Sequence, residues 1–130
     1  MPVELSARVC QFIDQNIESL AQLETLLLLR RHPDKSWDSA GIAKALYIAP
    51  EQAARLLADL GRRGMTSATA ASSLHYSFIP SSADYDATIA EVALAYEERR
   101  VAVISLIYSK PLNKVQTFAD AFRLRKEPPQ

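Results

Sequence analysis

Residue types that carry chemistry are scarce in this chain of 130 residues. Cys10 is the only cysteine, which excludes an internal disulfide and a thiolate metal cluster and favours a reducing, cytoplasmic location. The 3 glycines cannot supply a phosphate-cradling loop, and neither a P-loop nor a dinucleotide-binding pattern occurs. His32 and His75 are far apart and have no acidic cluster at ligand spacing. We therefore expect no metal, no cofactor and no catalytic residue.

An excess of charge of one sign is also absent. Lysine and arginine together number 15, as do aspartate and glutamate, so the formal net charge is zero. A neutral chain lacks the broad positive field that drives non-specific binding to nucleic acid. The neutral charge counts against DNA as a partner without excluding it, because a local basic face is sufficient.

Long hydrophobic runs are missing as well. The longest ones, residues 26–29 and 101–108, are far shorter than the roughly 20 residues of a membrane-spanning helix, so we expect no membrane contact. The N-terminus has no basic segment followed by an apolar run, and we expect no signal peptide. With 48% apolar residues, the chain can form one packed core.

The stretch 37–78 organises the chain. Asp38 or Ser39 can cap a helix over residues 39–48, and Pro50 fits the first position of a second helix over residues 50–63. Gly64 suits the end of that helix, and alternation in residues 74–78 indicates the second arm of a β-hairpin over residues 65–78. We expect the two helices to pack through Ile42, Leu46, Leu56 and Leu60.

The flanking segments read mainly as helices. A first helix is expected over residues 3–17, and Ser19 with Gln22 has the form of a capping box that starts a second, central helix. Trp37 is expected to pack in the core, with residues 35–37 as a short strand beside the hairpin. A long helix over residues 83–109, capped by Ser81, follows the hairpin. The predicted segments are an N-terminal helix (1–18), a helix-turn-helix with hairpin (19–80), a long helix for dimerisation (81–110), and a short amphipathic helix with a disordered tail (111–130).

This order of elements resembles the winged helix-turn-helix superfamily, and in general form its small bacterial regulators of the MarR and PadR type. The resemblance lies in residues 20–29, in residues 42–60 with Pro50 between the helices, and in the hairpin 65–78. It implies a mostly α fold with a small β-hairpin wing, and a homodimer that binds pseudo-palindromic DNA as a transcriptional regulator. The chain departs from such regulators at the wing tip, where alanine, serine and threonine replace arginine or lysine.

Two functions follow from the helix over residues 50–63. As a DNA-reading helix, it would use Gln52 and Arg55 to contact bases in the major groove, while Lys44, Arg62 and Arg63 would hold phosphates of double-stranded DNA. Alternatively, the face is simply solvated, with Glu51 and Asp59 balancing the arginines. The rival function is an adapter without DNA binding, which uses this same helix or residues 118–125 to bind another protein. The fold alone cannot separate a DNA reader from an adapter.

The long helix predicts a homodimer. Residues 101–108 are apolar on nearly all sides, so one side needs a partner, and a two-fold symmetric copy is the most economical one. Tyr96 and Tyr108 can also line a pocket between subunits, although core packing is the favoured role. Phe118 and Phe122 can bind a protein partner or the same subunit. The predicted dimer interface is Tyr96, Val103, Ile104, Ile107 and Tyr108.

Overall fold

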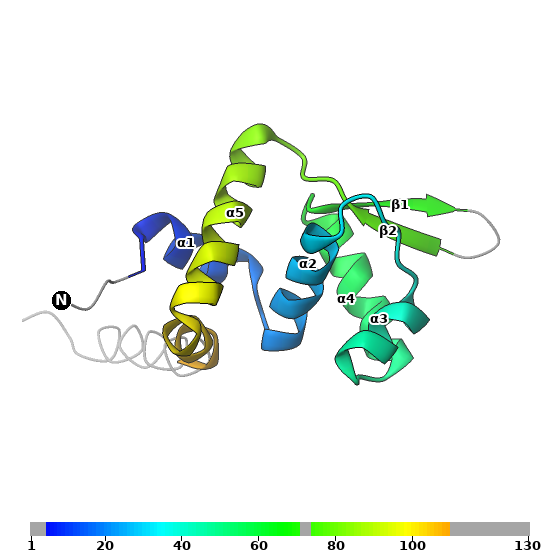
Figure 1. Ribbon diagram of the computed structural model, residues 1–130, viewed down its shortest axis with the longest axis horizontal. Helices are drawn as coiled ribbons and strands as arrows, with labels where there is room; N and C mark the ends of the chain where they lie inside the picture. Colours follow the sequence, from blue (N-terminus) through cyan, green and yellow to red (C-terminus); the bar gives the residue numbers. More distant parts are fainter. Residues whose placement is uncertain (1–4, 71–73, 110–130) are drawn as a thin grey trace, which may run out of the picture.

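The computed structural model describes residues 5–70 and 74–109. These residues form mainly helices, with one β-hairpin (Figure 1). Residues 100–109 add a helical segment after the last of the bounded helices. The elements in chain order are α1 (Ala7–Asn16), α2 (Leu20–Arg31), α3 (Ser39–Leu46), α4 (Pro50–Arg62), β1 (Thr66–Ala70), β2 (Leu74–Phe78) and α5 (Ala83–Glu98).

Side-chain caps set where the helices begin. Ser19 Oγ accepts from the backbone N–H of Gln22 at 3.1 Å, which confirms this cap, although the Gln22 side chain accepts from the N–H of Glu18 rather than completing a capping box with Ser19. Asp38, one of the two predicted candidates, caps α3, since its Oδ1 accepts from the N–H of Gly41 at 2.8 Å. Helix α1 begins only at Ala7, because Ser6 caps it. Helix α5 is capped by Ser82 rather than by the predicted Ser81, whose N–H donates instead to the carbonyl of Gly64 at 2.8 Å.

Strands β1 and β2 form the wing. They pair antiparallel, from Thr66 opposite Phe78 to Ala70 opposite Leu74. The predicted third strand is reduced to one bridge, in which Trp37 and Tyr76 exchange two backbone hydrogen bonds of 2.8 Å. This bridge fastens the loop between α2 and α3 to the wing. The predicted wing tip at residues 71–73 lies outside the described residues.

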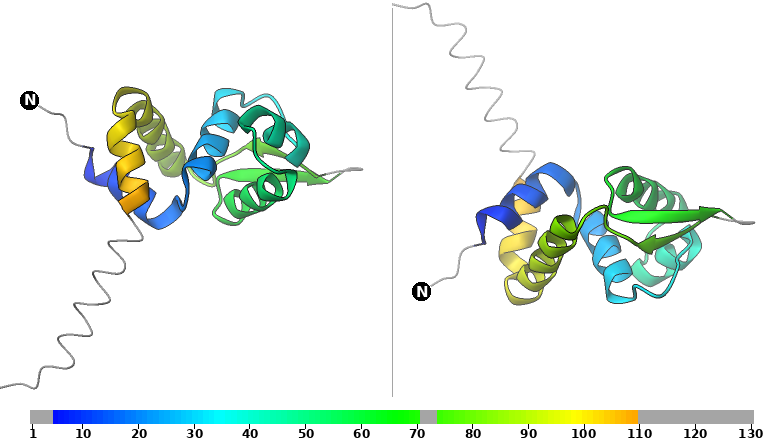
Figure 2. Two further views of the ribbon diagram at one scale, coloured as in Figure 1. Left: turned by 90° about the horizontal axis from the view of Figure 1, so that it is seen from below. Right: turned by 90° about the horizontal axis from the view of Figure 1, so that it is seen from above.

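Two apolar cores lie on either side of α2. In Figure 2, α1, α5 and residues 100–109 gather at one end of the molecule, and α3, α4 and the wing gather at the other. Leu23 and Leu26 of α2 belong to the first core, with residues such as Phe12 and Val92. Leu29, one turn further along α2, belongs to the second core, which also contains Ile42, Ala43, Ala53 and Leu57.

The predicted continuous helix over residues 83–109 is wrong, because the chain leaves helical geometry at Arg99 (φ −135°, ψ 48°). Residues 100–109 then run at an angle to α5 (Figure 2). The bend has a physical reason. Val103 and Ile107 are buried with Val9 and Phe12 of α1, and a straight continuation of α5 would carry them away from this core.

The packing of α3 on α4 differs from the prediction at Leu56 and Leu60. The buried positions of α4 are Ala53, Leu57 and Leu60, which recur at helical spacing, whereas Leu56 is only half-buried. Ala53 and Leu57 share a core with Ile42 of α3, while Leu60 belongs to the other core. Leu57, not Leu56, is therefore the central side chain of the helix-turn-helix core.

We predict that Leu57→Ala lowers the free energy of unfolding by about 2–5 kcal/mol, because it leaves a cavity where the leucine is 0% exposed. Leu56→Ala, the matched control on the same helix, should cost clearly less. Urea titrations followed by circular dichroism measure both values. Equal losses for the two variants would contradict the described orientation of α4.

Candidate nucleic-acid interface

The outward face of α4 is exposed to solvent. Glu51, Ala54, Arg55 and Arg62 are exposed, and at 100° per residue they lie opposite the buried stripe. Lys44 is exposed near the end of α3. The structure thus places Lys44, Arg55 and Arg62 where an external partner can reach them.

The turn that leads into α4 is unusual. Tyr47 has left-handed backbone geometry (φ 57°), as no other described residue except glycine does, and its side chain is 94% exposed. Ala49 precedes α4 and offers no side-chain cap, and Pro50 takes the first position as predicted. The start of α4 is therefore open to solvent. Sequence analysis did not single out Tyr47, since an exposed tyrosine has no local pattern.

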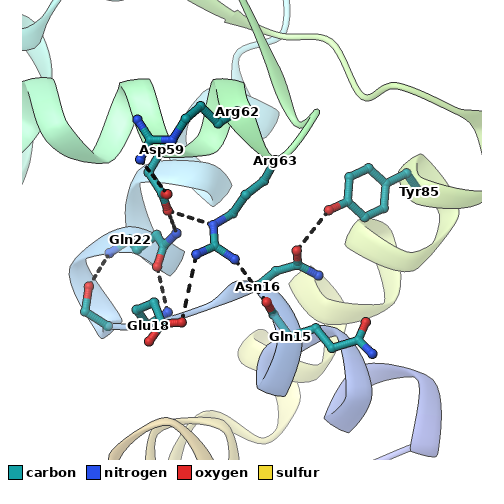
Figure 3. A network of polar contacts seen from close by, with 9 residues as sticks. Gln15, Asn16, Glu18, Gln22, Asp59, Arg62, Arg63 and Tyr85 are labelled. Carbon is teal, nitrogen blue, oxygen red and sulfur yellow. Dashed lines mark hydrogen bonds and ion pairs between the residues drawn. The ribbon is translucent and has the colours of Figure 1, made fainter.

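Gln52 and Asp59 lie on the flank of α4 and are half-buried. Asp59 faces the body of the protein, where its carboxylate accepts from Gln22 Nε2 of α2 at 2.6 Å. It also accepts from Arg63 Nε at 2.8 Å and from Arg62 Nη2 at 3.0 Å (Figure 3). Asp59 is thus a junction between α4 and α2 rather than a member of the outward face.

Arg63 lies on the same flank. Its Nη1 donates to the backbone carbonyl of Gln15 at 3.0 Å, and its Nη2 lies 3.9 Å from Glu18 Oε1 (Figure 3). The Arg63 side chain is 25% exposed, compared with 71% for Arg62. The structure therefore separates the predicted phosphate contacts: Arg62 projects into solvent, while Arg63 is directed at the segment between α1 and α2.

The end of α1 also contacts α5. Tyr85 Oη of α5 donates to Asn16 Oδ1 at 3.2 Å (Figure 3). Burial raises the pKa of Tyr85, and the nearby positive charge of Arg63 opposes this rise. Gln22 is 1% exposed and uses both ends of its amide, since its Oε1 accepts from the N–H of Glu18 at 2.6 Å. One polar network therefore connects the end of α4, the start of α2 and the start of α5.

The predicted dimer residues divide into two groups. Tyr96, Val103 and Ile107 are buried within the chain itself, where they pack in the core with α1, and this leaves little of their surface for a partner. Ile104 is half-buried, and Tyr108 is 64% exposed. Sequence analysis missed two exposed apolar side chains, Leu94 and Val101. Val101 could not be recognised because the bend at Arg99 changes which side of the following segment faces the core.

Tyr96 lies beside a cavity between α2 and α5. Its hydroxyl donates to Glu24 Oε2 at 3.3 Å, and the guanidinium carbon of Arg100 lies 4.8 Å from the ring centroid. Burial, followed by the negative charge of Glu24, raises the pKa of Tyr96, and Arg100 opposes the rise. The cavity measures about 470 Å³ and is lined by Leu27, Arg30, Arg31, Ala93, Tyr96, Glu97 and Arg100.

In residues 5–70 and 74–109, no group of three or more histidine, cysteine, aspartate or glutamate side chains lies close enough to hold a metal ion. No helix among the described residues is both long and apolar enough to cross a membrane.

The fold occurs in solved structures of low sequence identity. MepR, described as a transcription regulator of the Staphylococcus aureus multidrug efflux pump MepA, superposes with a TM-score of 0.55 at 15% identity over 92% of this chain and 88% of its own. YusO from Bacillus subtilis gives 0.54 at 14% identity over 90% and 82%. RV1404 from Mycobacterium tuberculosis gives 0.52 at 19% identity over 96% and 84%. No protein-family model and no curated protein matches the sequence.

These likenesses establish the class of the fold. The chain is a winged helix-turn-helix protein whose architecture is shared with MepR, YusO and RV1404, and the predicted resemblance to regulators of the MarR type is confirmed at the level of fold. At 14–19% identity, the similarity supports the fold but assigns no role to individual residues.

We predict that the stability of the protein falls as the pH rises through the ordinary tyrosine pKa of 10.0, in part because of Tyr96. The raised pKa in the folded state means that the unfolded chain loses this proton first, so the stabilising contribution is complete below that pH and is lost above it. Tyr96→Phe should make the fall shallower, whereas Tyr108→Phe, at an exposed position, should leave it unchanged. Urea unfolding at a series of pH values between about 8 and 11 measures the slopes. Parallel curves for the wild-type protein and Tyr96→Phe would contradict this role.

Proposed function

We propose that this protein is a DNA-binding transcriptional regulator of the winged-helix type, with no catalytic activity, and that α4 enters the major groove. The observation that carries the proposal is the exposed face of α4, where Arg55 and Arg62 project from the helix-turn-helix. A variant of MepR, which shares the fold at 14% identity, is described as bound to an oligodeoxyribonucleotide. Both facts favour DNA as the partner of this face of α4.

The exposed side chains divide between two roles. Arg55 lies at the middle of the outward face and is suited to guanine, while Gln52 lies at the edge of this face and is suited to adenine. Lys44 and Arg62 flank these residues and would hold phosphates, which fix the position of the helix along the duplex. The role of Arg63 is treated separately below, because its contacts direct it away from this face.

The low charge of the surface limits how the protein can bind. The chain as a whole is neutral, and Glu51 stands on the outward face beside Arg55. Non-specific affinity comes mainly from phosphate contacts, so we expect weak binding to random duplex and a loss of affinity with salt. The rival function is a protein-binding adapter. It is favoured by this same neutrality, while its other candidate residues, Phe118 and Phe122, lie outside the described residues.

The proposed regulator acts as a homodimer. Leu94 is 53% exposed on α5, and Val101 and Tyr108 are 78% and 64% exposed on the segment that follows. Exposed apolar side chains on neighbouring elements are typical of a protein interface, and a two-fold axis is the commonest arrangement. Such a dimer would present two copies of α4, as a pseudo-palindromic site requires.

Selection from a random duplex library at low salt tests DNA reading. We predict that the wild-type protein enriches a palindromic site, that Arg55→Ala relaxes the preference at particular base pairs, and that Arg62→Ala weakens binding to all sequences alike. The two variants remove the same charge from the same face, so each is the control for the other. A wild-type protein that enriches no sequence, while a protein partner is recovered by pull-down, would assign the function to the adapter.

Sedimentation equilibrium at micromolar concentration tests the dimer. We predict that the wild-type protein is a dimer and that Val101→Glu or Tyr108→Glu shifts it toward the monomer, because each would place a charge in the apolar interface. Ile79→Glu is the matched control, since Ile79 is also exposed (55%) but lies between the wing and α5. A monomeric wild-type protein would remove the dimer and the palindrome together.

A further inference from the structure

The carboxylate of Asp59 accepts hydrogen bonds from three side chains. It accepts hydrogen bonds from Gln22, Arg62 and Arg63 at 2.6–3.0 Å, and its side chain is 24% exposed. Gln22 is itself buried and held by the N–H of Glu18. The carboxylate is therefore fixed in position by α2, and it in turn fixes the arginine that follows α4.

Arg63 is held from three sides. Asp59 binds its Nε, the carbonyl of Gln15 binds Nη1, and Glu18 lies 3.9 Å from Nη2. An arginine with few internal contacts would be free to extend toward a phosphate near the end of the reading helix, as Arg62, 71% exposed, can do. Here the charge of Arg63 is instead directed at the α1–α2 segment (Figure 3).

We propose that Asp59 is a positioning residue that withholds Arg63 from DNA and so limits non-specific binding by α4. The inference rests on the proposed DNA-binding function and names a regulator of its affinity. Each arginine that reaches a phosphate strengthens binding to every sequence equally, whereas base contacts strengthen only the correct site. Keeping one cation inside the protein therefore lowers affinity for random duplex and raises the ratio of specific to non-specific binding.

The charges on α4 and its C-cap agree with this role. The basic residues here are Arg55, Arg62 and Arg63, and the acidic residues are Glu51 and Asp59. Asp59 is the acid of this pair that engages Arg63, and an acid this close to the DNA surface has a cost in affinity that a neutral residue would avoid. This loss of affinity for DNA is consistent with a protein whose function requires weak binding to random duplex.

The test is the salt dependence of binding to a random duplex, measured by fluorescence anisotropy. The slope of log affinity against log salt changes by about 0.9 for each phosphate contact. We expect Asp59→Asn to tighten binding at low salt and to steepen the slope by about one contact, which means about 3.5-fold more loss between roughly 50 and 200 mM salt. Lys44→Gln in the wild-type background removes a proposed phosphate contact, so it should make the slope shallower by about one contact and show that the assay resolves a single charge.

A double-mutant cycle with Arg63→Gln separates release of Arg63 from simple loss of a repulsive charge. In the wild-type background, Arg63→Gln should lower the melting temperature but leave the slope unchanged. In the Asp59→Asn background, it should return the slope to the wild-type value. Glu51→Gln is the control for charge, because it removes an acid from the same helix, and any gain that it produces should not depend on Arg63.

Each outcome has a defined meaning. A shallower slope for Arg63→Gln in the wild-type background would show that Arg63 already touches phosphate and would overturn the inference, even if Asp59→Asn failed to fold. An unchanged slope in folded Asp59→Asn, or a steeper slope that persists without Arg63, would also overturn it. Those results leave the proposed function intact, whereas a wild-type protein that binds neither random nor selected duplex at low salt rejects the proposed function itself.

Discussion

Helix α2 has to bury two of its sides, because both cores close against it. Leu23 and Leu26 complete the core made with α1 and α5, and Leu29 completes the core of the helix-turn-helix. The same constraint explains Gln22, a polar residue on a helix of leucines. Its amide is the point at which α2 is tied to α4 through a hydrogen bond rather than through packing alone.

Local sequence signals predicted the elements well where a short-range physical rule decides them. The caps at Ser19 and Asp38, the entry of α4 at Pro50 and the order of helices and hairpin all follow from contacts within a few residues. The bend at Arg99 could not be predicted, because nothing between residues 90 and 109 breaks a helix. The bend depends on the position of α1, some ninety residues earlier in the chain, against which Val103 and Ile107 pack.

The candidate interface was predicted only in part for a similar reason. Helical spacing placed Arg55 and Arg62 outward, and they are exposed. It also placed Asp59 outward, only about 40° from Arg55 around the helix. A small rotation of α4 relative to its neighbours decides whether such a residue faces solvent or another helix. The sequence of α4 alone does not predict that rotation. The polar groups of Gln22 and Gln15, which settle it, come from elements far away along the chain.

The core shared by α1, α5 and the segment after Arg99 also bears on the order of folding. Val9 and Phe12 share this core with Leu23 and Leu26 of α2, but also with Ile89, Val92, Val103 and Ile107, so the complete core closes a loop that includes the whole helix-turn-helix and wing. The contacts of α3, α4 and the wing are by comparison local in sequence and can form as soon as residue 78 has left the ribosome. Helix α1, although synthesised first, completes its packing only when residues 103 and 107 are in place. The two ends of the described chain therefore form one cooperative unit, and opening either end exposes the other to solvent.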